Sequence, residues 1–209
     1  SKVSYHDFQP IARFTSDPSS ITVRADSPWK TVEEFVAYAK ANPGKVTVSN
    51  AGNGSIPHLA AASFGEKVGT SFSHIPYLGS APAILGLVGG QVDATFVAYG
   101  ELKSHVESGK LRTLAVMGDK RLPGLEGVPT VKEKGIDLTS HVWRGVAVAR
   151  GTPSAITKRL REVAAKVAND PAFKDTLSKQ NLTFSYADAE EFRAQMEAQS
   201  AVYEKLIPS

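Results

Sequence analysis

The chain has 209 residues, of which 42% are hydrophobic and 22% charged, so it can bury a substantial core as one large α/β domain or two small ones. Its net charge of +3 is scattered without a dense basic run, which argues against nucleic acid as a partner. No apolar run is long enough to span a bilayer, and the lack of cysteine excludes disulfides and thiolate metal sites.

The first 44 residues predict two short strands and one well-marked helix. Ile11–Phe14 is typical of a short strand or a crossing segment, and Ile21–Arg24 of a second strand. Thr31 and Glu34 have the spacing of a capping box, in which each side chain accepts a hydrogen bond from a free backbone N–H at the helix start. We therefore expect a helix that begins after Thr31 and ends at the Asn-Pro-Gly sequence of residues 42–44.

A glycine-rich loop follows the next predicted strand, Val46–Val48. The loop consists of the small and polar residues Ser49–Ser55, and Pro57 then stands at a first helical position. A strand, a glycine loop and a helix start in this order aim unpaired backbone N–H groups and the positive end of the helix dipole at one point. We expect a ligand carboxylate to dock there. The alternative is an ordinary strand-to-helix turn whose glycines serve only its tight geometry.

Three named motifs are excluded at this loop. The dinucleotide fingerprint fails because Pro57 stands where its third glycine belongs. A phosphate-binding P-loop fails because no Gly-Lys-Ser/Thr follows. Ser55 is not in a nucleophile elbow, since Asn53 and Pro57 occupy its two glycine positions.

The same order of strand, loop and helix recurs after the first unit, and it predicts an α/β fold with a mainly parallel sheet. In such sheets ligands bind beyond the carboxyl ends of the strands, where the 50–55 and 77–80 loops both lie. The remaining predicted strands are Phe72–Ile75, Val92–Val97, Leu111–Met117, Val142–Val148 and Thr183–Tyr186, and the remaining helices begin near Pro82, Leu102, Pro153, Pro171 and Asp188.

Seven motifs follow one another along nearly the whole chain: Gly52-Asn53-Gly54-Ser55-x-x-His58-Leu59, His74-Ile75-Pro76-Tyr77-x-Gly79-x-x-Pro82-Ala83, Gly89-Gly90-Gln91-Val92-Asp93, Gly109-Lys110-Leu111-Arg112-x-Leu114-Ala115-Val116, Val128-Pro129-Thr130-x-x-Glu133-x-Gly135, Trp143-x-Gly145 and Gly151-Thr152-Pro153. In this order they resemble the Bug-type (TctC-like) substrate-binding proteins of tripartite tricarboxylate transporters.

The resemblance implies a periplasmic receptor of the type II periplasmic-binding-protein fold, whose two lobes close on a small carboxylate and deliver it to membrane permease subunits. It implies that the chain lacks roughly the first third of a typical member. Residues 1–20 would then be the crossover between lobes, 21–150 the second, ligand-binding lobe, and 151–209 a helical segment that returns to the first lobe.

The resemblance also assigns the ligand-binding residues, because the ligand loop of the family's second lobe matches Ser49–Ser55. Tyr77 could present its hydroxyl to the cleft or pack in the core, and His58 and His74 are expected to be structural. Arg144 could bind a carboxylate or form a salt bridge. The expected ligand-binding residues are Ser49, Asn50, Gly52, Asn53, Gly54, Ser55, Tyr77 and Gly79.

Two positions depart from the family pattern. The residue after Tyr77, often polar or basic in the family, is Leu78, and the residues after Phe96, often acidic or amidic, are Val97 and Ala98. If these side chains lie beside the ligand, they favour a less functionalised acid or weaken its binding. The alternative is that they face the core.

No set of residues in the sequence has the pattern of a catalytic site, and no histidine spacing indicates a metal site, so we expect no enzyme, metal or cofactor. Two other functions stay open at this point. The chain could be the ligand-sensing effector domain of a transcriptional regulator, which shares this broad architecture. It could also be an acyl-transfer enzyme that uses Ser55, which would need a histidine within reach such as His58.

The helices from Pro153 onward have apolar faces that need a cover, because large exposed apolar patches are rare on monomers. We expect them either to collapse against the remaining lobe or to pair with a second copy of the chain, by exchange of these helices. The residues concerned are Leu160, Val163, Phe192 and Met196.

Overall fold

The computed structural model describes residues 4–206, with side chains through residue 204, and the chain divides into two compact units. Unit 1 combines the residues up to Asp17 with those from Trp143 onward, and unit 2 runs from Pro18 to Val142. The lobe boundaries expected at residues 20 and 150 concern a whole two-lobed receptor and stay a prediction.

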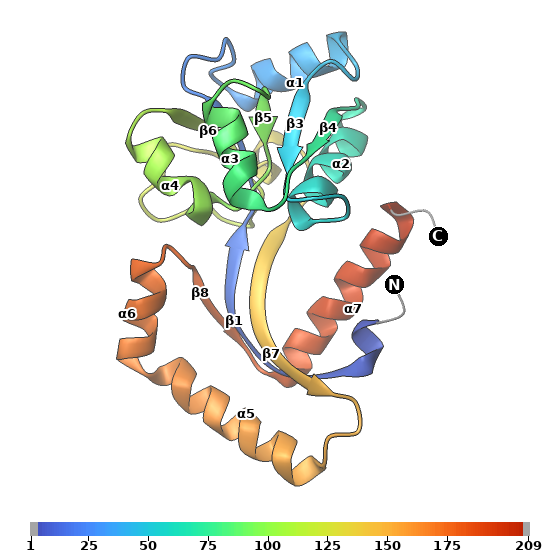
Figure 1. Cartoon of the computed structure of the whole chain (residues 1–209), viewed down its shortest axis with the longest axis vertical. Helices are drawn as coiled ribbons and strands as arrows, with labels where there is room; N and C mark the ends of the chain where they lie inside the picture. The colour runs from blue at the N-terminus through green and yellow to red at the C-terminus, as the bar shows by residue number, and fades with distance from the viewer. Residues whose placement is uncertain (1–3, 207–209) are drawn as a thin grey trace. The chain divides into compact units, whose positions relative to one another are not determined.

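Unit 2 is a five-stranded sheet with helices (Figure 1). Its elements are β2 (Ser20–Arg24), α1 (Val32–Ala41), β3 (Thr47–Asn50), α2 (Ile56–Val68), β4 (Ser73–Pro76), α3 (Ser80–Val88), β5 (Ala94–Thr95), α4 (Tyr99–Glu107), β6 (Leu111–Val116) and the 3-10 turn η2 (Lys132–Lys134). The strand order is β4-β3-β5-β2-β6. β3 pairs in parallel with β4 and β5, whereas β2 is antiparallel to β5 and β6. Four of these strands thus point the same way, which confirms the predicted α/β fold.

Two apolar clusters hold unit 2 together, and the two residues that follow β5 point into different ones. Phe96 packs into a cluster with side chains of α1 and α2, including Phe35 and Phe64. Val97, the next residue, packs into a second cluster with Leu87 of α3 and with α4. Since successive side chains of an extended chain point to opposite faces, the helix pairs α1/α2 and α3/α4 cover opposite faces of the sheet.

Helix α1 begins where the sequence predicts. The Thr31 hydroxyl accepts a hydrogen bond from the Glu34 N–H at 3.2 Å, and the Glu34 carboxylate accepts one from the Thr31 N–H. The predicted capping box is therefore confirmed. The strand expected at Val92–Val97 is shorter in the structure, because only Ala94–Thr95 pairs between β2 and β3.

Unit 1 contains a three-stranded sheet of order β7-β1-β8 with three helices. Its elements are the 3-10 turn η1 (Tyr5–Asp7), β1 (Phe8–Pro18), β7 (His141–Ala149), α5 (Ser154–Asn169), α6 (Pro171–Lys179), β8 (Phe184–Ala187) and α7 (Ala189–Leu206). The short strand expected at Ile11–Phe14 is thus the middle of an 11-residue strand. Within residues 4–206, no helix combines the length and the apolar character that crossing a membrane requires.

A buried carboxylate ties three segments of unit 1 together. Asp17 is 2% exposed, and its two oxygens accept hydrogen bonds from the Arg144 guanidinium at 2.9 Å and from the Thr183 N–H at 2.7 Å. Of the two roles open to Arg144, the structure therefore has the salt bridge. Next to it, the Trp143 ring lies edge-on to Phe192 with 4.9 Å between centroids, and Phe192 is 2% exposed.

Gly145 of β7 gives the sharpest test of this packing. An alanine methyl group there would lie 2.6 Å from the Phe192 ring and 2.7 Å from the Ala12 carbonyl oxygen, which is backbone and cannot swing away. We predict that Gly145→Ala lowers the free energy of unfolding by about 1–3 kcal/mol, the usual cost of overpacking, in urea titrations.

Gly127→Ala is the matched control, since no atom lies within 4 Å of the new methyl group and the backbone does not have a positive φ there. Its free energy of unfolding should stay within about 0.5 kcal/mol of the parent. Equal stability of the two variants would contradict the packing described for β7.

Candidate functional site

Three helix N-termini meet at the carboxyl edge of the sheet, because α2, α3 and α4 follow the parallel strands β3, β4 and β5. Their N-cap residues are Ser55, Gly79 and Ala98, and none of these makes a side-chain hydrogen bond to the helix start. The first N–H groups of these helices therefore have no side-chain cap, in contrast to α1. This edge can offer backbone donors and positive dipole ends to an anion.

Asn50 ends β3 and shapes the loop that follows. Its side chain is fully buried, and its amide oxygen accepts a hydrogen bond from the Gly52 N–H at 3.0 Å, which folds the chain into a tight turn. The amide nitrogen of Asn50 is also buried and has no hydrogen-bond partner among the described residues. An unpaired buried donor costs free energy, so it marks a place for a ligand acceptor.

The end of the loop holds a second unpaired group. The Ser55 hydroxyl is buried without a partner in the described part of the chain. The Ser55 N–H donates to the Gly52 carbonyl at 3.1 Å, and the Gly54 N–H donates to His58 Nδ1 at 3.0 Å. Gly54 has φ +77° and Gly52 φ +117°, conformations that residues with a Cβ rarely adopt. His58 thus braces the loop, in agreement with its expected structural role.

Ser49 belongs to the framework of the site. Its hydroxyl donates to the Ala83 carbonyl of α3 at 3.1 Å, and its carbonyl accepts from the Thr95 hydroxyl of β5 at 3.1 Å. The side chain is 0% exposed. These bonds fix the end of β3 to its neighbours, so Ser49 can position the loop, whereas its hydroxyl is already used.

The second loop meets the first through its backbone. The Tyr77 N–H donates to the Asn50 carbonyl at 3.0 Å, and Gly79 has φ +121° at the start of α3. The Tyr77 ring packs in the second cluster, beside Gly86, and its hydroxyl is hydrogen-bonded to the Gln91 amide oxygen at 3.2 Å. Of the two roles left open for Tyr77, its side chain has the packing role, while its backbone lies beside the loop.

The residues at the two positions that depart from the family pattern differ in their exposure to solvent. Leu78, between Tyr77 and the N-cap of α3, is fully exposed. Val97 and Ala98 are 0% and 1% exposed, and Val97 lies in the second core cluster. Leu78 is therefore available to contact a ligand held at this edge, whereas Val97 and Ala98 face the interior.

The one histidine near the loop in sequence is already hydrogen-bonded to it. His58 is the nearest histidine in sequence to Ser55, and its Nδ1 is already the acceptor of the Gly54 N–H. Within residues 4–206, no group of three or more histidines, aspartates or glutamates is placed to hold a metal ion. What this edge offers is a set of hydrogen-bond donors, which matches the acceptor oxygens of a carboxylate.

Two histidines pack together behind the loop. The His58 and His74 rings meet edge to face with 4.6 Å between centroids, and His74 Nδ1 is buried without a partner among the described residues. Burial lowers the pKa of His74 from its usual 6.5, and the charge of His58 lowers it further. The neutral form of His74 is therefore the one that the folded chain favours.

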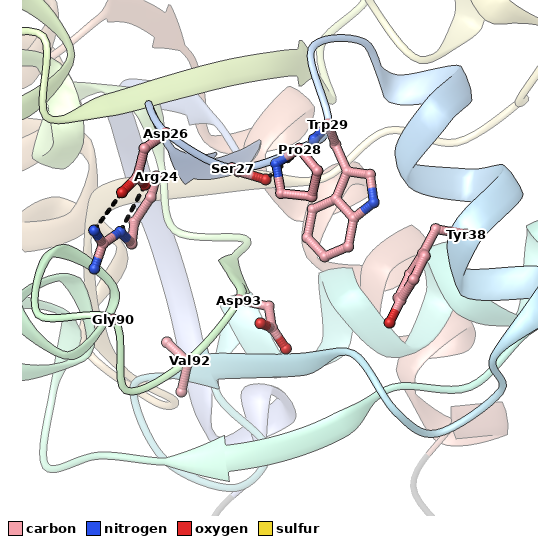
Figure 2. Close-up of a pocket in the computed structure, with 9 residues that line it drawn as sticks. All are labelled: Arg24, Asp26, Ser27, Pro28, Trp29, Tyr38, Gly90, Val92 and Asp93. Carbon is pink, nitrogen blue, oxygen red and sulfur yellow. Dashed lines mark hydrogen bonds and ion pairs between the residues drawn. The ribbon is translucent and has the colours of Figure 1, made fainter.

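A separate hollow of about 420 Å³ lies at the opposite edge of the sheet, beside Trp29, Tyr38 and Asp93 (Figure 2). Asp93 is hydrogen-bonded to Thr47, the first residue of β3, whereas the candidate loop follows its last residue. Sequence reasoning missed this hollow, because its residues come from three separate segments of the chain.

The chain is similar to known proteins over its whole length. The family model described as "Tripartite tricarboxylate transporter family receptor" matches residues 1–209. A UPF0065 protein of Cupriavidus necator is 36% identical over 201 residues, which are 96% of this chain and 61% of that relative. The chain thus spans less than two thirds of the length of this curated relative.

Solved structures of similar proteins have the same fold. A TctC solute-binding protein from Polaromonas, solved without ligand, is 47% identical with a TM-score of 0.85, and the match covers 99% of this chain and 71% of that one. The Rhodopseudomonas palustris protein Rpa4515, solved with adipate, is 28% identical with a TM-score of 0.84 over 95% of this chain and 67% of that one.

The lowered pKa of His74 predicts a pH dependence of stability. The unfolded chain takes up the proton more readily than the folded chain, so the contribution of His74 is fully present above about pH 6.5 and is lost as the pH falls toward the lowered value. We predict that the free energy of unfolding falls as the pH is lowered below about 6.5, and that His74→Asn makes this fall smaller.

His6→Gln serves as the control, because His6 is exposed and belongs to unit 1. It should leave the pH dependence of the unfolding free energy unchanged. A His74→Asn variant whose stability falls as steeply as that of the parent would contradict the assignment.

Proposed function

The chain belongs to the tripartite tricarboxylate transporter receptor family, and we propose that it binds a small carboxylate at the loop of residues 50–55. In this proposal it works in the periplasm and delivers the acid to the membrane permease subunits of its transporter. The family is one of substrate-binding receptors rather than enzymes.

One observation carries the proposal. The buried amide nitrogen of Asn50 and the buried hydroxyl of Ser55 have no partner among the described residues, and they lie in a loop that joins the sheet to an uncapped helix. A carboxylate supplies oxygens that accept from both kinds of group and from backbone N–H donors. Hydrogen bonds to a charged group are worth about 1.5–3 kcal/mol each, so two or three of them supply about 3–9 kcal/mol. Micromolar binding needs about 8 kcal/mol after association costs of about 4 kcal/mol or more, so this loop alone supports weaker binding.

The loop favours an anion even without a cationic side chain. Backbone N–H groups at a helix start carry a partial positive charge, which the helix dipole adds to. The glycines let the backbone approach a ligand closely, since Gly54 has no atom within 4 Å of the place where a Cβ would stand. A small acid held in this way has its free end directed beyond the loop, where Leu78 is exposed.

The two other functions have weaker support. A transcriptional effector domain has nothing specific in its favour, whereas the receptor family model matches the chain from end to end. An acyl-transfer enzyme would need a base beside Ser55. His58 Nδ1 accepts the Gly54 N–H, so it could act as this base only if that hydrogen bond broke. The Ser55 hydroxyl has no hydrogen bond to a histidine or to any other described residue.

The chemistry of the ligand follows from Leu78. The exposed Leu78 side chain can pack against methylene groups of a ligand but makes no hydrogen bond. We therefore propose an acid whose chain beyond the docked carboxylate is mainly apolar. Adipate, which the Rhodopseudomonas palustris relative binds in its solved structure, has such a chain.

Pairing with a second copy remains a proposal for unit 1. Val146 on β7 and Ile156 and Val163 on α5 are 40–51% exposed, which supports an apolar contact between copies. Phe192, by contrast, is buried within its own unit against Trp143 and needs no further cover. Light scattering over a range of concentrations measures this association.

Ser55→Ala is the direct test of the binding loop. Because the Ser55 hydroxyl is buried without a hydrogen bond within the described chain, its removal should not lower the unfolding free energy and should raise it by up to about 1–3 kcal/mol. The dissociation constant for small carboxylates should rise roughly 10-fold or more, since one hydrogen bond to a charged group is lost. Calorimetric titration with a panel that includes adipate measures this.

Ser108→Ala is the matched control, because Ser108 ends α4 and its hydroxyl donates to the His105 carbonyl. It should leave the dissociation constant unchanged. If Ser55→Ala binds carboxylates as tightly as the parent, the hydroxyl is not part of the site.

Leu78→Ser tests the chemistry of the ligand. If Leu78 contacts the apolar chain of the acid, the variant should lose affinity for adipate relative to the shorter, hydroxylated malate. Loss of contact with about one methylene group, worth about 0.8 kcal/mol, changes the ratio of dissociation constants about fourfold. Leu85→Ser on α3, 62% exposed in the parent, is the control and should leave the ratio unchanged. An unchanged ratio in Leu78→Ser would remove Leu78 from the site.

A further inference from the structure

The hollow at the amino edge of the sheet is built from three segments of unit 2 (Figure 2). The end of β2 and the loop after it contribute Arg24, Asp26 and Trp29, α1 contributes Tyr38, and the turn before β5 contributes Asp93. The volume of about 420 Å³ is sufficient for the end of a long side chain. The carboxylate loop proposed above lies at the other end of β3, so a ligand there leaves this hollow open.

The charges around the hollow do not balance. Arg24 and Asp26 neutralise each other, because the guanidinium donates to both carboxylate oxygens, from Nε at 2.9 Å and from Nη2 at 2.6 Å. In Asp93, one oxygen accepts from both the N–H and the hydroxyl of Thr47, at 2.8 and 2.7 Å. The other oxygen of Asp93 has no hydrogen bond within the described residues. One uncompensated negative charge therefore faces the hollow.

Lys30, in the loop after β2, already makes hydrogen bonds to that loop. The Lys30 ammonium group donates to the carbonyls of Ser27, at 2.5 Å, and Ala25, at 3.5 Å. No ion pair to Asp93 is found within residues 4–206, so the chain does not supply the cation that its carboxylate could bind.

Aromatic rings line the side of the hollow next to this carboxylate. The Trp29 and Tyr38 ring centroids are 5.1 Å apart with 53° between the ring planes. In Figure 2 the Asp93 side chain lies between these rings and the Arg24–Asp26 pair. A carboxylate and aromatic rings that line one hollow suit an alkylammonium or guanidinium group, through a charge-assisted hydrogen bond and cation–π attraction.

We propose that this hollow binds an arginine or lysine side chain of a protein partner, with the charged end at Asp93 and the stem against Trp29 and Tyr38. Charge complementarity argues for a cationic occupant. A position that stays open while the carboxylate loop is occupied suits a partner that engages the loaded receptor. The identification of that partner with the membrane subunits of the transporter rests on the proposed function, whereas the binding of the cationic side chain does not.

The test is an NMR titration of the chain with N-acetyl-arginine amide, in which the indole N–H signal of Trp29 is followed. Trp143→Phe assigns this signal, because the chain has two tryptophans. We expect a saturable shift with a dissociation constant in the millimolar range, and no saturable shift with the uncharged N-acetyl-norleucine amide.

Variants test the two halves of the proposed contact. Asp93→Asn keeps an oxygen for Thr47 and removes the charge, and it should weaken binding at least fivefold. Tyr38→Ser changes a side chain that is 42% exposed and should weaken binding about threefold. Glu33→Gln is the control, because it removes an exposed carboxylate of α1 that does not line the hollow. It should leave the dissociation constant of the arginine amide unchanged.

Four results would overturn the proposal. These are an unmoved Trp29 signal, an equal response to the norleucine amide, full affinity in Asp93→Asn, and tighter binding of putrescine, which would assign the hollow to a soluble cation. Adipate binding, measured on the same variants, reports on the carboxylate loop alone, so the two claims can fail separately.

Discussion

A buried hydrogen-bond donor without a partner costs about 1–3 kcal/mol, and unit 2 holds the Asn50 amide and the Ser55 hydroxyl in this condition. Both lie in the loop at the carboxyl edge of the sheet, where three helices begin without side-chain caps. The chain thus retains unsatisfied donors at one edge while it satisfies those of α1 with a capping box. A ligand with acceptor oxygens would recover this cost on binding, and a carboxylate is the simplest such ligand.

The rest of unit 2 keeps these donors in place before any ligand arrives. Ser49 joins the end of β3 to α3 and β5, and the Tyr77 N–H joins it to β4. His58 holds the Gly54 N–H from the following helix. Beneath the sheet, aromatic side chains of Phe35, Phe64, Phe72 and Phe96 pack together. Because a preorganised loop loses less conformational entropy on binding, this framework contributes to affinity without touching the ligand.

Local signals in the sequence were sufficient for much of this fold. The capping box of Thr31 and Glu34, the glycine loop and Pro57 each act within a few residues, and the structure has the helices that they predict. The side-chain role of Tyr77 could not be predicted in this way. It depends on Gly86, whose missing Cβ makes room for the Tyr77 hydroxyl, and on Gln91. The unpaired state of Asn50 and the hollow beside Trp29 likewise depend on contacts between distant segments.

The central claim is that a carboxylate docks at the loop of residues 50–55, and backbone-amide NMR of the chain titrated with adipate tests it most directly. The account predicts that the largest saturable shifts fall on the N–H groups of residues 51–55 and on Ser80 at the start of α3, since these groups surround the proposed site. If the largest shifts instead fall on residues 26–29 and Asp93, or if saturating adipate moves no signal of the loop, the account is contradicted.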